Sequence, residues 1–347
     1  MVSAYTLWGH RLVILAASLA PLLGMTATAR ADDSHRITIL EENDSIYFNS
    51  DKHYTQGIRA SDLGPALAPK DGWNRPFDWV GNVAPIFQGG GVDTQRRYAV
   101  FLGQSIFTPK NLTLRPPDPT DRPYGGWLYV GTSLLQETHR NMLENLELDA
   151  GVVGPGAFGK QVQNDFHQLI GDAQAKGWSN QIQNEPGVTL TYERLWRLPL
   201  VSLGGISSDF VPQLGATVGN VFTYGEVGAL FRVGHNLQAD YGPVRIRPAL
   251  SGTDYFDASH LEGHYGYYWY IGAQGRAVGR NMFLDGNTFR QSPHVQKRIL
   301  VADYLTGVTV FGGQAWRLDF SMARRTREFI GQKSSDVLGT AALSIGF

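Results

Sequence analysis

The sequence predicts an all-β protein: a transmembrane antiparallel β-barrel of about twelve strands, with one short helix near its extracellular rim. Three observations predict this fold. The chain opens on an apolar segment of the kind that directs secretion, and it closes on an alternating strand that ends in an aromatic residue. Between them lie segments of strand length that are rich in small residues and carry aromatic residues near their ends.

The first segment is predicted to be a secretory signal peptide. Arg11 precedes an apolar run over 12–23, and Ala29-Arg30-Ala31 matches an A-x-A cleavage pattern. The run is shorter than the roughly 20 residues that a helical membrane span needs, which argues against the alternative of a short anchor. Residues 1–31 are therefore assigned to a signal peptide and residues 32–347 to the barrel domain. No long apolar run follows.

Charge and cysteine content narrow the class of protein. The formal charge of the 347-residue chain is −1, and removal of Arg11 and Arg30 with the signal peptide lowers it to −3. A nucleic-acid partner is not expected, since such proteins usually carry a basic surplus. The chain has no cysteine, so a secreted form must draw its stability from its sheet and core rather than from disulfides.

The last strand is the clearest to recognise. Leu343, Ile345 and Phe347 alternate with Ser344 and Gly346. In outer-membrane barrels the final strand commonly closes the barrel and ends in phenylalanine. Phe347 therefore predicts an interaction with the outer-membrane assembly machinery. The alternative is a soluble protein whose last strand happens to end in this residue.

Eleven further segments have strand length and composition, which gives an even total of about twelve. Most approach the ~9–11 residues that a tilted strand needs to cross a bilayer. Long polar connections over 64–95, 108–125 and 235–264 are expected on the outside. The competing architecture is a soluble β-sandwich or lipocalin-like barrel. The eleven segments lie near 36–43, 53–63, 96–107, 126–137, 142–153, 187–197, 208–219, 222–234, 265–277, 298–311 and 315–325.

One polar segment, "KQVQNDFHQLIG" over 160–171, interrupts this pattern with helical spacing. Gln163 and His167 are four residues apart and share one helix face. Phe166, Leu169 and Ile170 are expected to pack the helix against the barrel wall. A single histidine is a weak catalytic signal, so a surface histidine on a loop is the alternative.

A second polar cluster lies in "LEENDSIYFNSDKHYTQG" over 40–57. Asn43 and Asp44 end the first strand and Thr55 opens the second, so a hairpin brings them together. Carboxylate, amide and hydroxyl oxygens suit a hard cation such as calcium. The alternative is a solvated turn, since Asn, Asp and Ser are ordinary turn residues, and no loop has EF-hand spacing.

Four stretches carry a family resemblance: "ENDSIYFNSDKHYTQG", "DRPYGGWLYVG", "GVVGPGAFGKQVQNDFHQLIGD" and "GWSNQIQNEPGVTLTYER", in this order. Together they resemble the outer-membrane lipid A 3′-O-deacylase family over most of the mature chain. The resemblance implies a twelve-stranded barrel in the bacterial outer membrane with its site near the outer rim. It also implies calcium-dependent hydrolysis of an ester-linked acyloxyacyl chain of lipopolysaccharide, so lipid A and outer-membrane lipid are the expected partners.

The family's functional residues transfer position by position. Asp172 matches a family acidic residue only approximately, and the family's loop lysine falls on Leu114, with Lys110 and Arg115 nearby. Lys110 and Arg115 are therefore the candidates for substrate binding, and Asp44 and Asp172 the candidates for metal binding. The candidate catalytic residues are Asn43, Asp44, Thr55, Gln163 and His167.

The expected chemistry is ester hydrolysis without a serine nucleophile, because no G-x-S-x-G elbow occurs. His167 is expected to act as general base on water, oriented by Asp44 or Gln163. A Ca²⁺ ion would stabilise the oxyanion. Three alternatives stay open: a porin-like or structural barrel without catalysis, a soluble periplasmic binding barrel, and a phospholipid esterase that uses the same residues.

Overall fold

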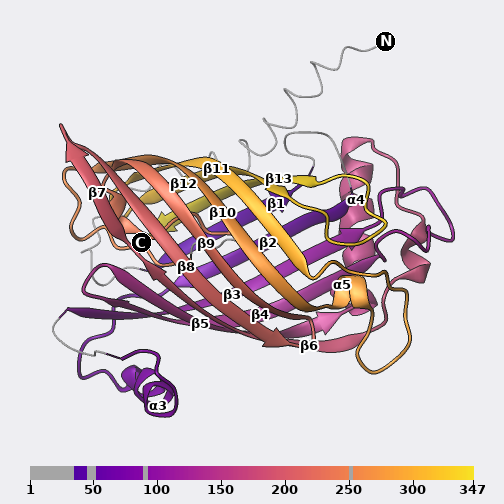
Figure 1. Cartoon of the computed structure of the whole chain (residues 1–347), viewed down its shortest axis with the longest axis horizontal. Coiled ribbons are helices and arrows are strands. Elements are labelled where there is room, and N and C mark those ends of the chain that lie inside the picture. Colours follow the sequence, from indigo (N-terminus) through magenta and orange to yellow (C-terminus); the bar gives the residue numbers. More distant parts are fainter. Residues whose placement is uncertain (1–34, 45–51, 89–92, 250–252) are drawn as a thin grey trace, which may run out of the picture.

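A computed structural model describes residues 35–44, 52–88, 93–249 and 253–347 of the chain. Antiparallel strands form one sheet in the order β6-β5-β4-β3-β2-β1-β13-β12-β11-β10-β9-β8, and β6 also pairs with β8, which closes the barrel (Figure 1). The twelve-stranded barrel is thus confirmed. A short extra strand, β7, pairs with β8 in a protruding hairpin. The assigned signal peptide lies outside the described residues.

The strand positions agree closely with the predicted segments. The strands are β1 Arg36–Asn43, β2 His53–Leu63, β3 Thr94–Thr108, β4 Gly125–Thr138, β5 Met142–Val153, β6 Glu185–Trp196, β7 Leu198–Leu203, β8 Ile206–Gly219, β9 Phe222–His235, β10 Tyr265–Asn281, β11 Leu300–Gly312, β12 Trp316–Arg325 and β13 Asp336–Gly346. The α-helices are α3 Arg75–Val83, α4 Gly159–Ile170 and α5 Met282–Asp285. Short 3₁₀ turns are η2 Gly72–Asn74, η3 Pro155–Ala157, η4 Gly177–Asn180 and η5 Leu237–Ala239.

The two faces of the barrel wall have opposite polarity. In β1 the inward side chains of Arg36 and Thr38 are buried, whereas the outward Ile37 and Ile39 are 45% and 46% exposed. A similar alternation runs through the other strands of the closed barrel, though not through β7, and surrounds the barrel with exposed apolar side chains. This arrangement, polar inside and apolar outside, is the inverse of a soluble barrel and is typical of a strand-built membrane span. No helix in the described part of the chain has the length and apolarity needed to cross a bilayer.

Connections at the two ends of the barrel differ from those predicted. One end, here the α4 rim, carries the connections over 109–124, 154–184, 282–299 and 326–335. The opposite end, the C-terminal rim, carries the long connections over 64–88 and 236–264, which the sequence placed on the outside together with 108–125. That placement was wrong because successive strands run in opposite directions, so successive connections alternate between the two rims. The rim of a connection therefore depends on its place in the strand order and not on its length.

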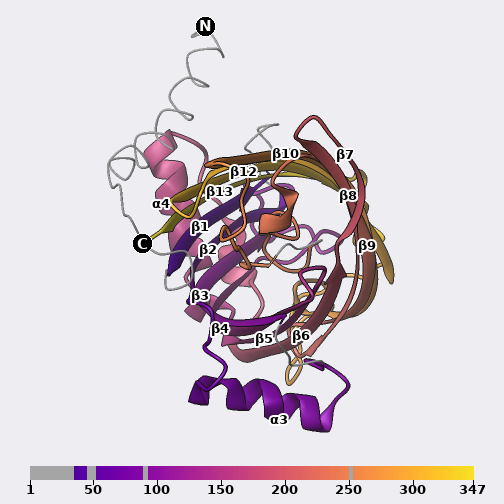
Figure 2. The same ribbon diagram turned by 90° about the vertical axis from the view of Figure 1, so that its left-hand side faces the viewer.

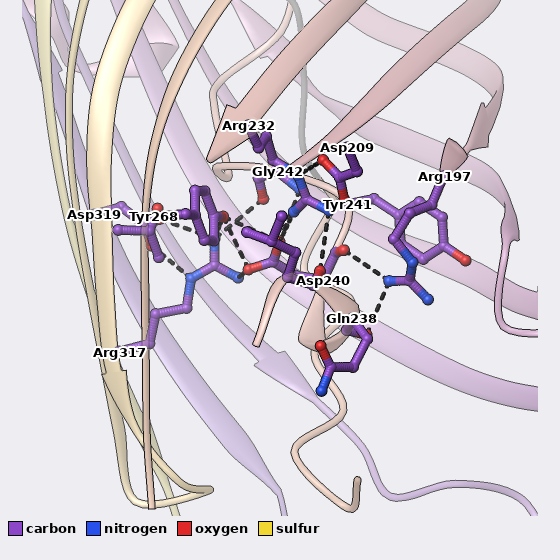
Figure 3. Close-up of polar contacts among 12 residues, drawn as sticks. Arg197, Asp209, Arg232, Gln238, Asp240, Tyr241, Gly242, Tyr268, Arg317 and Asp319 are labelled. Atoms are coloured by element: carbon purple, nitrogen blue, oxygen red, sulfur yellow. Dashed lines mark hydrogen bonds and ion pairs between the residues drawn. The ribbon is translucent and has the colours of Figure 1, made fainter. Parts of the chain in front are cut away.

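The connection between β9 and β10 fills the barrel interior from the C-terminal rim (Figure 2). Asp240 is fully buried there and pairs with Arg232 at 2.5 Å and with Arg317 at 2.9 Å (Figure 3). Further along the connection, Arg247 pairs with Glu147 at 2.8 Å and with Glu193 at 2.6 Å. These contacts join the connection to strands on several sides, so the described part of the interior is occupied by paired charges.

Candidate active site

Polar residues of β1, β2 and β3 lie on the outward face of the barrel at the α4 rim. Asn43 shares the outward parity of Ile37 and Ile39, and Thr108 shares that of the exposed Val100 and Leu102. A bulge between Tyr54 and Gln56 changes the parity of β2 at Thr55. As a result the Thr55 hydroxyl oxygen lies 2.6 Å from that of Thr108.

Helix α4 packs against this outward wall. The Gln104 side-chain amide on β3 donates a hydrogen bond of 2.6 Å to the carbonyl oxygen of Ala157, in the turn that precedes α4. Gly126 on β4 permits the close approach, because a Cβ atom there would lie 3.1 Å from the Cβ atom of Ala157. The candidate site therefore lies outside the barrel interior, between wall and helix.

Local backbone signals set the ends of α4 where the sequence predicts them. Gly154 has a φ of 96°, and a Cβ atom there would lie 2.6 Å from the Gln183 backbone, so glycine is required at this turn. Gly171 closes the helix in the left-handed conformation, and the Asp172 N–H donates to the His167 carbonyl at 2.8 Å. The helix over 159–170 is confirmed.

Gln163 is fixed by a tryptophan that the sequence did not identify as a site residue. The indole N–H of Trp178 donates to Gln163 Oε1 at 2.9 Å, and both side chains are buried. Trp178 also packs with Tyr124 and with Ile106 of β3. Because its oxygen is already oriented by an N–H donor, the amide group of Gln163 is positioned to donate.

His167 is oriented by the main chain. Its Nδ1 atom lies 2.5 Å from the carbonyl oxygen of Ala173, just beyond the helix end, and the side chain is buried. A carbonyl oxygen only accepts hydrogen bonds, so Nδ1 carries the proton and Nε2 is the nitrogen that can accept one. The sequence expected Asp44 or Gln163 in this orienting role; the structure gives it to the Ala173 carbonyl.

Three apolar side chains on or next to α4 are exposed, among the exposed polar side chains of Gln161, Asp165 and Gln168. Phe158, Phe166 and Leu169 are 53%, 42% and 73% exposed. The expectation that Phe166 and Leu169 pack against the wall was wrong, and the side chain of Ile170 lies outside the described residues. The physical reason is that a helix beside a membrane barrel can direct apolar side chains to lipid as well as to protein.

The two candidate metal ligands, Asp44 and Asp172, differ in their exposure to solvent. Asp44 is buried and its Oδ2 atom accepts a hydrogen bond of 2.6 Å from the Lys52 backbone. Asp172 is exposed and accepts from the Ala173 backbone at 2.8 Å. In the described part of the chain, no group of three or more His, Asp or Glu side chains gathers to hold a metal. The oxygen donors of Asn43, Asp44 and Thr55 nevertheless have the chemistry that a hard cation needs.

Residues of β3 connect the candidate residues of the wall, which include Thr55, with those of α4, which include Gln163. Thr108 contacts Thr55, and Ile106, two residues earlier, packs with Trp178, the partner of Gln163. The candidate substrate cations Lys110 and Arg115 are both exposed on the next connection.

A buried ionic cluster at the same rim had no signal in the sequence. His53 contacts Asp336 through Nδ1 at 2.8 Å and Asp121 through Nε2 at 3.4 Å, and Arg122 pairs with Glu328 at 3.1 Å. Burial by itself would raise the pKa of Glu328, but the neighbouring guanidinium groups of Arg122 and Arg325 hold that pKa below its ordinary value. His53 and Asp336 lie 283 residues apart, which explains why spacing did not reveal them.

Of the two solved structures compared below, the first supports the fold. LpxR from Salmonella typhimurium superposes with a TM-score of 0.69 at 19% sequence identity, covering 89% of this chain and 99% of that one. The β-domain of the Bordetella autotransporter BrkA superposes with a TM-score of 0.42 at 8% identity, covering 91% of this chain and 99% of that one. A comparison with curated protein sequences gives no match.

A family model described as outer membrane protein LpxR matches residues 12–347. This match covers nearly the whole chain, and it agrees with the closed barrel and its apolar outer wall in placing the protein in the bacterial outer membrane. The chain therefore belongs to the LpxR family of outer membrane proteins.

Proposed function

We propose that this protein is a lipid A 3′-O-deacylase, an ester hydrolase that removes an ester-linked acyloxyacyl chain from lipopolysaccharide. The observation that carries the proposal is the two-sided character of α4. Its buried face presents Gln163 and His167, whereas Phe166, Leu169 and the preceding Phe158 are exposed beside the polar Gln161, Asp165 and Gln168. A helix with the candidate catalytic groups toward the wall and both apolar and polar groups outward suits an amphiphilic substrate that carries an ester and long acyl chains.

In the proposed reaction, His167 is the general base. Its Nε2 atom takes a proton from a water molecule as the water oxygen attacks the carbonyl carbon of the ester. Collapse of the tetrahedral intermediate breaks the bond to the sugar oxygen, and the proton on Nε2 returns to that oxygen. The products are the free acyloxyacyl acid and a sugar hydroxyl group.

Donors on the wall and the helix are proposed to stabilise the oxyanion. The amide group of Gln163 is oriented by Trp178, and the side chains of Asn43 and Thr55 lie on the outward wall. Donors fixed before the reaction stabilise developing charge without further reorganisation, which is where most of the rate enhancement would arise.

Calcium dependence is part of the proposal. Asp44 would supply the charged ligand, and oxygens of Asn43 and Thr55 are of the type that calcium accepts. Asp172 remains a candidate ligand from its place just beyond α4, although its carboxylate is exposed. When bound, the ion would polarise the ester carbonyl.

The proposed orientation places the α4 rim at the outer leaflet, where lipopolysaccharide is found. The site lies outside the barrel interior, so an acyl chain would reach it sideways from the membrane along α4. Lys110 and Arg115 are proposed to contact anionic groups of the substrate from the neighbouring connection. A phospholipid esterase using the same residues is the runner-up, because the exposed apolar side chains of α4 suit any acyl chain.

The porin-like alternative has less support. The connection over 236–264 brings Asp240, Arg245 and Arg247 into the barrel, where all three are buried and paired with charges of the wall. A pore needs an open aqueous path, whereas these contacts bridge the interior.

The test uses the purified full-length protein in detergent micelles. Lipid A and phosphatidylethanolamine are offered separately, with calcium or with a chelator, and released acids are identified by mass spectrometry. Release of an acyloxyacyl acid from lipid A, lost on chelation, is expected. Release of fatty acid only from phosphatidylethanolamine would replace the proposal by the phospholipid esterase, and no release from either would reject ester hydrolysis.

A further inference from the structure

A separate hollow lies on the outer wall of the barrel at the α4 rim, beside β11 and β12. It has a volume of about 520 Å³ and is bounded by the ends of these strands and by the connection over 326–335. Tyr304 and Arg324, which face each other across β11 and β12, both point outward. The hollow is therefore on the lipid side of the wall and not in the barrel interior.

Three of the side chains that line the hollow are cations: Arg324, Arg327 and Lys333. All three are exposed, and no carboxylate is among the lining residues. The Nε atom of Arg324 donates to the Ser335 hydroxyl at 2.9 Å, which fixes the guanidinium at the edge of the hollow. Asp118 interacts electrostatically with Lys333 but does not line the hollow. Guanidinium and ammonium groups gathered in a hollow lined by no carboxylate are suited to an anion, and arginine in particular to phosphate oxygens.

The surface next to the hollow is apolar. Toward the C-terminal rim, the outward positions of β11 and β12 are occupied by Val308, Phe320 and Met322, which are 44%, 44% and 38% exposed. Met322 is two residues from Arg324, a step of about 7 Å along a strand. A ligand with a phosphate in the hollow and acyl chains along these side chains would match both surfaces, whereas a free phosphate ion would use only the first.

One residue connects the hollow with the candidate active site. The Lys52 ammonium donates to Ser334, which lines the hollow, at 3.3 Å, and the Lys52 backbone donates to Asp44 at 2.6 Å. Strands β12, β13, β1 and β2 are successive neighbours in the sheet. Three strand spacings amount to about 14 Å, so the two sites lie on one continuous outer surface.

We propose that this hollow binds a phosphate group of a phosphorylated, multiply acylated lipid of the outer leaflet and holds that lipid beside α4. The identity of the lipid as substrate rests on the proposed function; the binding itself does not. The hollow would supply anchoring cations on the side of the active site opposite to Lys110 and Arg115.

Native mass spectrometry of the full-length protein in detergent tests the proposal. All measurements use a His167→Ala background, so that bound lipid is not consumed. The probes are bisphosphorylated lipid A, the same lipid after enzymatic dephosphorylation, phosphatidylglycerol and inorganic phosphate. The test variant is Arg327→Gln/Lys333→Gln, and the matched control is Lys160→Gln/Arg290→Gln, which removes two exposed cations of the same rim outside the hollow. A third variant, Arg327→Lys/Lys333→Arg, keeps the charge.

The test variant is expected to bind bisphosphorylated lipid A about tenfold more weakly, the equivalent of about 1.4 kcal/mol, while the control and the charge-conserving variant bind normally. Dephosphorylated lipid A should bind weakly to every variant, and phosphatidylglycerol, with one phosphate and two chains, less tightly than lipid A. Equal affinity of test and control variants would overturn the proposal. So would full competition by inorganic phosphate, which would indicate a simple ion site. Binding through the hollow without any hydrolysis by the active protein would refute the proposed function and leave this site standing.

Discussion

The Nδ1 atom of His167 lies 2.5 Å from the carbonyl oxygen of Ala173, which places the proton of the neutral imidazole on Nδ1 and makes Nε2 the nitrogen that the proposed reaction uses as base. Replacing His167 by alanine should therefore lower the deacylation rate by about 10²- to 10⁴-fold, the usual contribution of a general base. Rates of acyl release by the purified protein measure the effect. His294→Ala, an exposed histidine of the same rim, is the control. Equal rates for both variants would remove His167 from the mechanism.

Trp178→Phe removes the hydrogen bond to Gln163 and keeps most of the buried ring. The loss of one such bond is worth about 1 kcal/mol, so kcat should fall about fivefold with little change in KM. Steady-state kinetics on lipid A provide the two constants. Trp79→Phe, at a tryptophan that is 67% exposed on α3, should leave both unchanged. A rise in KM alone would mean that Gln163 binds the ground state and not the transition state.

The exposed apolar side chains of α4, Phe166 and Leu169, should matter only for long acyl chains. In Phe166→Gln/Leu169→Gln, the KM for lipid A is expected to rise about tenfold, because each side chain contributes part of the ~1.5–3 kcal/mol that full burial of such a group is worth. Hydrolysis of a short, water-soluble ester should not change. Gln161→Ala/Gln168→Ala alters exposed polar positions of the same helix and serves as control. A parallel loss on both substrates would point to a damaged helix instead.

Asp240 is the centre of the ionic network inside the barrel, with Arg232, Arg317 and Tyr268 as partners (Figure 3). Asp240→Asn removes a negative counter-charge that the buried guanidinium groups of Arg232 and Arg317 share. The free energy of unfolding should therefore fall by about 3 kcal/mol. Urea unfolding in lipid vesicles measures this, with the exposed Glu262→Gln as control. The same vesicles should show no steady ion conductance for the unaltered protein, and a stable open-channel current would revive the porin-like alternative.

The pairing of Arg122 with Glu328 predicts a pH dependence at the α4 rim. The pKa of Glu328 is lowered in the folded protein, so its contribution to stability is present above the ordinary glutamate value of about 4.3 and is lost as the pH falls through the lower folded value. The protection of backbone amides against hydrogen exchange, relative to the intrinsic exchange rate at each pH, should therefore fall below about pH 4.3 in the connections over 109–124 and 326–335. In Glu328→Gln, the amides of these connections should already be less protected at neutral pH than in the unaltered protein, and their protection should depend much less on pH. Identical pH profiles would show that the pair does not hold the rim.

The fold was largely predictable because outward apolar and inward polar side chains alternate along the strands of a membrane barrel. Alternation at Leu343 and Ile345 marked the last strand, and strand length and composition located the other eleven barrel strands. The extra strand β7 was missed because its six residues are all exposed and show no alternation. The position of the long connections was missed because their length carries no information about the rim.

The candidate site was only partly predictable. Helical spacing located Gln163 and His167, and the resemblance placed Asn43, Asp44 and Thr55 beside them. The orienting group of His167 is a backbone carbonyl, which side-chain identity at position 173 does not specify. Trp178 lies 15 residues after Gln163 in the same connection, but no spacing rule marks their contact. His53 and Asp336 are 283 residues apart, so only the closed barrel brings them together.

The most direct measurement is mass spectrometry of lipid A from cells that express the protein, beside cells that express His167→Ala at the same level in the outer membrane. The proposed function predicts that the unaltered protein removes one acyloxyacyl mass, and that the variant and calcium chelation each abolish this loss. Lipid A of unchanged mass, with the protein folded in the outer membrane, would contradict it.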